Sequence, residues 1–143
     1  MKKMSVLCLL FIFNISCQSK SDYKAARTEV VKIHDEVMVY SGLAEKRKMK
    51  LDTLFTKMDS LYKIKSVSDT LSEKQQIEGL SNRLQEVDTK MDHWMHDFNP
   101  SLDGQSNKEA VAYFQLEKDK IEALEVLYKQ VLKDADDYLL RFK

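Results

Sequence analysis

Two short segments hold all three histidines of the chain and three of its seven methionines. They are His34-Asp35-Glu36-Val37-Met38 and Met91-Asp92-His93-Trp94-Met95-His96-Asp97-Phe98. Imidazole and thioether groups are soft donors that can select a cation such as Cu(I), above all where no free thiol competes for it. The candidate ligands of such a copper site are His34, Met38, Met91 and Met95.

The same segments also have a packing interpretation. Met91, Trp94 and Phe98 recur at the spacing of a buried helix face, and methionine often fills gaps in protein cores. His34 would then hydrogen-bond a carboxylate or a backbone carbonyl across the helix interface. A four-ligand zinc site is disfavoured, because no pair of His, Cys or carboxylate residues has the spacing that recurs in structural zinc sites.

Acid–base or nucleophilic catalysis finds little support in the sequence. Asp35 and Glu36 are adjacent carboxylates, but no second carboxylate or nucleophile is expected to face them. Ser41 and His34 are two helical turns apart, and nothing predicts an oxyanion hole beside them. We therefore expect a protein that is not an enzyme.

The composition excludes two classes of binding protein. The chain has 143 residues, of which 23 are basic and 23 acidic, with only three glycines and one proline. Three isolated glycines cannot build a Gly-rich phosphate loop, and a balanced charge offers no basic field for a nucleic acid. Scarce glycine and proline in a chain that is 32% charged favour long helices.

Apolar residues spaced by three and four predict three helices, over about residues 23–64, 71–98 and 107–141. The first apolar stripe lapses at Arg47, and the third lapses at Lys118. The first stripe keeps its register through Gly42, where we expect a kink; the alternative is two helices broken at that glycine.

Capping motifs mark the starts of the second and third helices. Thr70 with Glu73, and Ser106 with Glu109, match the capping box, in which each side chain bonds the other residue's backbone N–H. Asn99-Pro100 ends the second helix, because the residue before a proline disfavours helical backbone.

The predicted fold is an all-α, elongated three-helix bundle or coiled coil in up-down-up order, since short loops join antiparallel neighbours. The first helix would be about 60 Å long at about 1.5 Å per residue. In an antiparallel pair around the first loop, the numbers of facing residues sum to about 135. Met38 would then lie near Asp97, and His34 within a turn of Phe98, which brings both segments to one end of the bundle.

The first residues predict an export signal. The cationic start Met1-Lys2-Lys3 precedes a short apolar run over residues 4–13, which is typical of a signal peptide and shorter than the roughly 20 residues of a membrane span. The run leads to Ile15-Ser16-Cys17, which resembles a bacterial lipobox, although Asn14 stands where an aliphatic residue is usual. Diacylation of Cys17 would anchor the protein to a membrane. The alternative is that Cys17 is an ordinary residue after a conventional signal.

The predicted organisation is a lipoprotein signal peptide over residues 1–16, a lipidated N-terminus and tether over 17–22, and one helical bundle domain over 23–143. Removal of the signal would take away two lysines, leaving 21 basic side chains against 23 acidic ones. No thiol would be left for a disulfide or a nucleophile, because Cys8 is removed and Cys17 carries the lipid.

Three internal motifs accompany the lipobox: I-H-D-E-V-M at 33–38, W-M-H-x-F at 94–98 before a proline, and a charged third-helix stretch at 114–121. Together they resemble a family of small lipoproteins of Bacteroidota, often labelled "viral A-type inclusion protein". The resemblance implies a helical lipoprotein of the Gram-negative envelope, with no established activity. Gln18-Ser19 after the cysteine suggests, by family habit, an outer-membrane protein facing the periplasm. Beside the candidate ligands, the resemblance marks Asp35, Glu36, Trp94, His96 and Phe98.

The sequence thus predicts a non-enzymatic, lipid-anchored rod that acts as a structural or protein-interaction module. Its expected partners are a membrane, through the lipid, and another envelope protein or its own copies. The alternative is a lipoprotein that binds copper or a small ligand through its histidine and methionine cluster. No nucleic-acid partner is expected.

Overall fold

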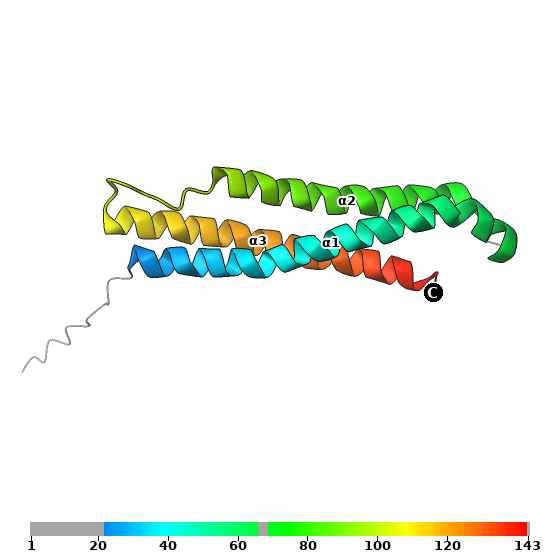
Figure 1. Cartoon of the computed structure of the whole chain (residues 1–143), viewed down its shortest axis with the longest axis horizontal. Coiled ribbons are helices and arrows are strands. Elements are labelled where there is room, and N and C mark those ends of the chain that lie inside the picture. Colours follow the sequence, from blue (N-terminus) through cyan, green and yellow to red (C-terminus); the bar gives the residue numbers. More distant parts are fainter. Residues whose placement is uncertain (1–21, 66–68, 143) are drawn as a thin grey trace, which may run out of the picture.

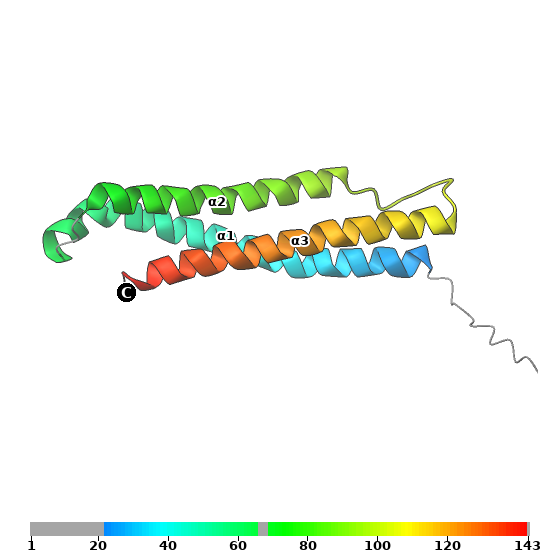
Figure 2. The same cartoon turned by 180° about the vertical axis from the view of Figure 1, so that it is seen from behind.

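The computed structural model describes residues 22–65 and 69–142, and these form three long α-helices and no strand (Figure 1). The helices are α1 (Tyr23–Lys65), α2 (Thr70–Asp97) and α3 (Asn107–Leu140). They lie side by side in an elongated bundle, with α2 running opposite to α1 and α3 (Figures 1 and 2). The predicted up-down-up bundle is confirmed, and each predicted helix boundary is within one residue of the observed one.

The predicted signal peptide and Cys17 lie outside the described residues. Among the helices that are described, none combines the length and the hydrophobicity needed to cross a membrane.

The core follows a strict seven-residue repeat on every helix. One series of positions is at most 1% exposed: Val30, Val37, Ala44, Leu51 and Met58 on α1, Ile77, Leu84 and Met91 on α2, and Phe114, Ile121, Tyr128 and Ala135 on α3. A second series three residues further along completes the core with Val87, Trp94 and Val131 among its members. Two apolar positions per heptad are the signature of a coiled coil, so coiled-coil packing holds the three helices together where they run side by side.

Helix α1 continues without a break through Ser41 and Gly42. Val37 and Ala44, on either side of this point, are both fully buried. The alternative of two helices broken at Gly42 is therefore wrong, because the continuous core stripe outweighs the low helix propensity of one glycine.

The two predicted capping boxes have different outcomes. At α3, Ser106 and Glu109 exchange side-chain and backbone hydrogen bonds as predicted. At α2 the N-cap is Asp69, whose carboxylate accepts hydrogen bonds from two backbone N–H groups at 3.1 Å. The prediction of Thr70 as N-cap is wrong by one residue, since a carboxylate is the better cap and Glu73 is used elsewhere. Glu73 accepts hydrogen bonds from Tyr138 of α3 and from Arg141, the residue that follows that helix.

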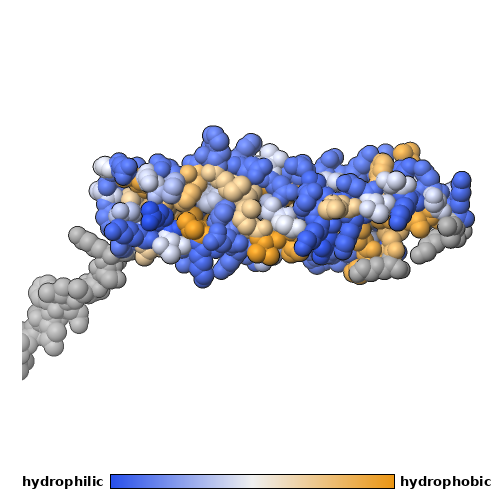
Figure 3. All heavy atoms as spheres, viewed as in Figure 1, coloured by the Kyte–Doolittle hydropathy of each residue, from blue (hydrophilic) through white to orange (hydrophobic). Residues whose placement is uncertain are grey.

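The surface of the rod is largely hydrophilic, with separate hydrophobic areas on the face shown in Figure 3. The exposed apolar side chains include Val31, Met38 and Val39 on α1, Met95 on α2 and Val126 on α3.

Candidate functional site

A stack of rings joins the two chemically rich segments. His34 of α1 lies over Trp94 of α2, with ring centroids 5.7 Å apart and planes within 25°. Trp94 in turn stacks on Phe98 at 4.9 Å, with planes within 21°. The heptad repeat places Trp94 at a core position, and His34 follows the core residue Ile33, so both rings are held at the α1–α2 interface.

The stack continues onto α3. Phe98 contacts Tyr113 at 6.5 Å and Phe114 at 6.2 Å between ring centroids. The hydroxyl oxygen of Tyr113 accepts a hydrogen bond from the backbone N–H of Asn99 at 2.8 Å, which ties the α2–α3 loop to the cluster. Aromatic pairs in such geometries add about 0.5–1.5 kcal/mol each beyond their buried area. We refer to His34, Trp94, Phe98, Tyr113 and Phe114 as the aromatic cluster.

His34 does not make the predicted hydrogen bond across the interface. Its Nδ1 lies 3.1 Å from a carboxylate oxygen of Asp35, the next residue on its own helix, and across the interface it stacks on Trp94. The helix register explains the change of neighbour. Ser41 of α1 pairs with Asp88 of α2, so the numbers of two residues that face each other across these helices add up to 129 there, whereas the predicted sum is 135. Each residue of α1 therefore faces an earlier residue of α2 than predicted. His34 therefore meets Trp94, one turn before Phe98.

The four candidate copper ligands are only partly brought together. His34 and Met95 line one pocket of about 250 Å³, with Val31, Trp94 and Phe98 as the other lining residues. Met38 does not line this pocket, and Met91 is 1% exposed within the core. In residues 22–65 and 69–142, no group of three or more His, Cys, Asp or Glu side chains is placed to hold a metal ion.

The remaining marked residues point to solvent. His96 pairs with Asp97 at 3.2 Å, and both side chains are at least 80% exposed. Glu36 lies 3.8 Å from Lys32 on the same helix face. Asp35 is 73% exposed beside His34. These contacts are those of a solvated helix surface, which contributes little to stability.

Trp94 also borders a second pocket, of about 410 Å³, between α2 and α3. Its Nε1 is buried and has no hydrogen-bond partner among the described residues. On the α3 side of this pocket, Glu117 is 5% exposed and accepts a hydrogen bond from Lys120 at 2.7 Å. That hydrogen bond raises the pKa of Lys120. The lapse in the third apolar stripe lies at Glu117, one residue before the predicted Lys118; Glu117 is seven residues before the buried Leu124, and that spacing is the signal that marks it.

A hydrogen-bonded node links all three helices near the middle of the rod. Ser41 of α1 and Tyr128 of α3 both donate to the same carboxylate oxygen of Asp88 on α2, at 3.1 and 2.8 Å. Burial raises the pKa of the Tyr128 phenol, and the hydrogen bond to Asp88 adds to the effect. Ser41 thus has a carboxylate as its partner and not His34, which is the arrangement of a structural link between helices.

The chain matches no protein-family model, no curated protein and no solved structure. The resemblance to the Bacteroidota lipoproteins therefore stays a prediction.

Proposed function

We propose that the protein is a lipid-anchored envelope protein that works without catalysis, as an interaction module. The observation that carries this proposal is the pocket of about 250 Å³ between α1 and α2, which lies over the aromatic cluster and which we call the groove. Val31 and Met95 form its rims and are 41% and 38% exposed, while Trp94 and Phe98 form its floor. Aromatic residues and methionine are enriched in the centres of protein interfaces, where a few such residues carry most of the binding energy.

The groove is preorganised. Its floor is fixed by ring stacking from His34 to Phe98, so a partner would find the surface already formed and would lose little affinity to ordering it.

The groove also lies close to the predicted anchor. Val31 is eight residues beyond Tyr23 on α1, which is about 12 Å along the helix axis. The five residue-to-residue steps from Cys17 to Asp22 span at most about 18 Å when extended. Acylation of Cys17 would therefore hold the groove close to the membrane surface, where it would meet membrane-embedded or peripheral proteins. Placement in the outer membrane, facing the periplasm, and membership of the Bacteroidota lipoprotein family belong to the same proposal.

The decisive experiment is site-specific photo-crosslinking of the full chain in envelope membranes of a Gram-negative host. A benzophenone amino acid at Met95 should crosslink to a protein partner or to a second copy, whereas the same group at Val126 of α3 should not. Val126 is a matched control because it is 65% exposed but lies away from the groove.

A second set of variants tests the chemistry of the surface. Val31→Glu places a charge on the rim of the groove and should reduce crosslinking from Met95 about tenfold or more, since a desolvated charge costs several kcal/mol. Val126→Glu should leave it unchanged. Recovery of monomer alone, or equal crosslinking from Met95 and Val126, would refute the proposal.

A further inference from the structure

The end of the rod opposite the aromatic cluster carries a larger pocket between α1 and α3. The two helices start at the same level, where the backbone N–H of Tyr23 donates to Asn107 at 3.1 Å. Since α1 has 43 residues and α3 has 34, α1 runs on past the end of α3 by nine residues, or about 13 Å (Figure 1). The seam that α3 fills along the rest of the bundle is open beyond this point.

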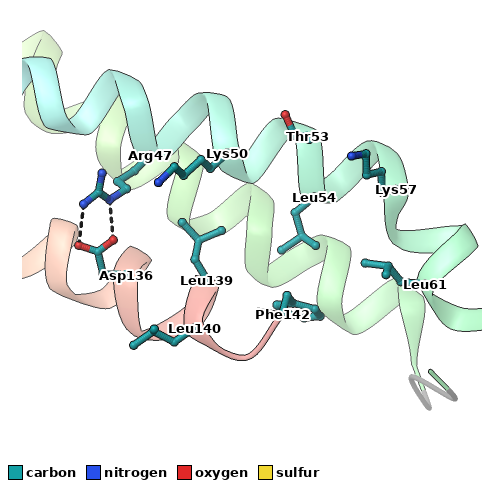
Figure 4. Close-up of a pocket in the computed structure, with 10 residues that line it drawn as sticks. All are labelled: Arg47, Lys50, Thr53, Leu54, Lys57, Leu61, Asp136, Leu139, Leu140 and Phe142. Atoms are coloured by element: carbon teal, nitrogen blue, oxygen red, sulfur yellow. Dashed lines mark hydrogen bonds and ion pairs between the residues drawn. The ribbon is translucent and has the colours of Figure 1, made fainter. Parts of the chain in front are cut away.

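Apolar side chains from both helices line the opening. Figure 4 shows Leu54 of α1 and Leu139 pointing toward each other, with Leu61 and Phe142 bordering the same space. The pocket has a volume of about 670 Å³. That size is typical of small-molecule sites, which range over about 300–1,000 Å³.

The polar lining of this pocket is predominantly cationic. Arg47 closes one end through a two-pronged ion pair with Asp136, at 2.5 and 3.0 Å (Figure 4). Asp136 is the one acidic residue in the lining of this pocket, and its charge is balanced by Arg47. Lys50 and Lys57 line the α1 side, and neither makes an ion pair with a carboxylate of the described residues. The pocket thus combines an apolar interior with two uncompensated positive charges.

We propose that this pocket binds a single-chain amphiphile with an anionic head group, of which a long-chain fatty acid is the simplest example. The head group lies at Lys50, beside Arg47, and the alkyl chain runs over Leu54 and Leu139 toward the open tip. The pairing of an apolar cavity with a few placed charges is the usual design of such sites. This site goes beyond the proposed function and does not depend on it.

The ligand is a separate molecule and not the chain's own lipid. Leu54 is 31 residues beyond Tyr23, or about 47 Å along α1. The tether from Cys17 spans at most about 18 Å, and an acyl chain reaches about half of the roughly 30 Å hydrocarbon core of a bilayer. An acyl group on Cys17 therefore falls short of the pocket.

The test uses the full chain in neutral phosphatidylcholine vesicles with a diazirine-bearing fatty acid as the probe. After irradiation, mass spectrometry should place the label on peptides containing Leu54 and Leu139–Phe142, and excess dodecanoate should compete it away. A diazirine-bearing alkyl trimethylammonium of the same chain length is the charge control and should label these peptides at least fivefold less.

Charge-reversal variants on the exposed face of α1 complete the design. Lys50→Glu should lower labelling about fivefold, because it removes an attraction at the head group and adds a repulsion of the size seen for exposed pairs. Lys57→Glu should lower labelling less, because Lys57 lies two turns further along α1, about 10 Å from the head group, where solvent screens its charge. Lys24→Glu, at an exposed position near the start of α1 and far from the pocket, should leave labelling unchanged. Circular dichroism melts verify that all three variants stay folded.

Three outcomes would overturn the proposal. One is labelling spread evenly along α1 and α3, and another is equal labelling by the cationic probe. The third is equal labelling of the same peptides by a photoactivatable diacyl phosphatidylglycerol, which would make this tip a membrane-contact surface instead of a pocket for a free amphiphile.

Discussion

Replacing Tyr128 with phenylalanine should destabilise the bundle by about 2 kcal/mol. The side chain is fully buried, and its hydroxyl donates to Asp88 at 2.8 Å. A hydrogen bond to a charged group contributes about 1.5–3 kcal/mol. Asp88 is only partly buried and keeps its bond from Ser41, which favours the lower half of that range. At about 4 °C per kcal/mol for a domain of this size, the melting temperature should fall by about 8 °C.

Chemical denaturation and thermal melts of the wild type and Tyr128→Phe measure this directly. Tyr62→Phe is the matched control, because Tyr62 is 48% exposed and its hydroxyl makes no hydrogen bond to the described residues. Its effect should stay within about 0.5 kcal/mol. A double-mutant cycle with Asp88→Ala should give a coupling energy above about 1 kcal/mol. A coupling near zero, or equal losses in Tyr128→Phe and Tyr62→Phe, would show that the node does not join the helices.

The same node sets an alkaline limit to stability. Burial and the bond to Asp88 raise the pKa of Tyr128 above its ordinary value of 10.0. The folded protein therefore keeps a proton that the unfolded chain releases, so this stabilisation is present below pH 10 and is lost as the pH rises above it. Denaturation in a pH series across 10 should show a steeper fall for the wild type than for Tyr128→Phe. Identical slopes would contradict the assignment.

Three further predictions concern the cap, the anchor and the metal. Asp69→Ala should cost about 1 kcal/mol of unfolding free energy whereas Thr70→Ala should cost clearly less, because Asp69 caps α2; equal losses in denaturation would contradict that cap. Incorporation of labelled palmitate should be lost in Cys17→Ala, and retained labelling would refute acylation of this cysteine. Equilibrium dialysis should show no tight Cu(I) binding that depends on His34 and Met38, since only His34 of the two lines the groove; binding that disappears in the His34→Ala/Met38→Ala variant would restore the copper interpretation.

Periodicity predicted the fold because the same signal recurs many times along the chain. On α1 the fully buried residues recur every seven positions from Val30 to Met58, and a single lapse at Arg47 cannot disturb a pattern of that length. The end of the second helix and the start of the third could also be predicted, since Pro100 and the capping box of Ser106 with Glu109 are local sequence signals. Nothing in these predictions required knowing which residue of one helix faces which residue of another.

The candidate site depended on that missing information. The pattern on each helix is unchanged when one helix slides along another, but each slide of one turn replaces every neighbour. The predicted register brought His34 near Phe98, and the observed one puts it on Trp94. Asp88 was missed for the same reason, because on its own helix it belongs to the polar face and only the facing Ser41 and Tyr128 make it a link.

Polar residues that interrupt the apolar stripes select one register from those that heptad packing allows. Sliding α3 by seven residues toward the tip would keep apolar positions matched with apolar positions, but it would separate Arg47 from Asp136 and Tyr128 from Asp88. A partly buried guanidinium left without its carboxylate is strongly destabilising, and single polar residues at core positions fix register in coiled coils in this way. Because α3 is held back at this register, it ends before α1 does and leaves the last turns of α1 without α3 beside them. The ion pair between Arg47 and Asp136, which lines one end of the pocket between α1 and α3, therefore also fixes the register that leaves this pocket unfilled.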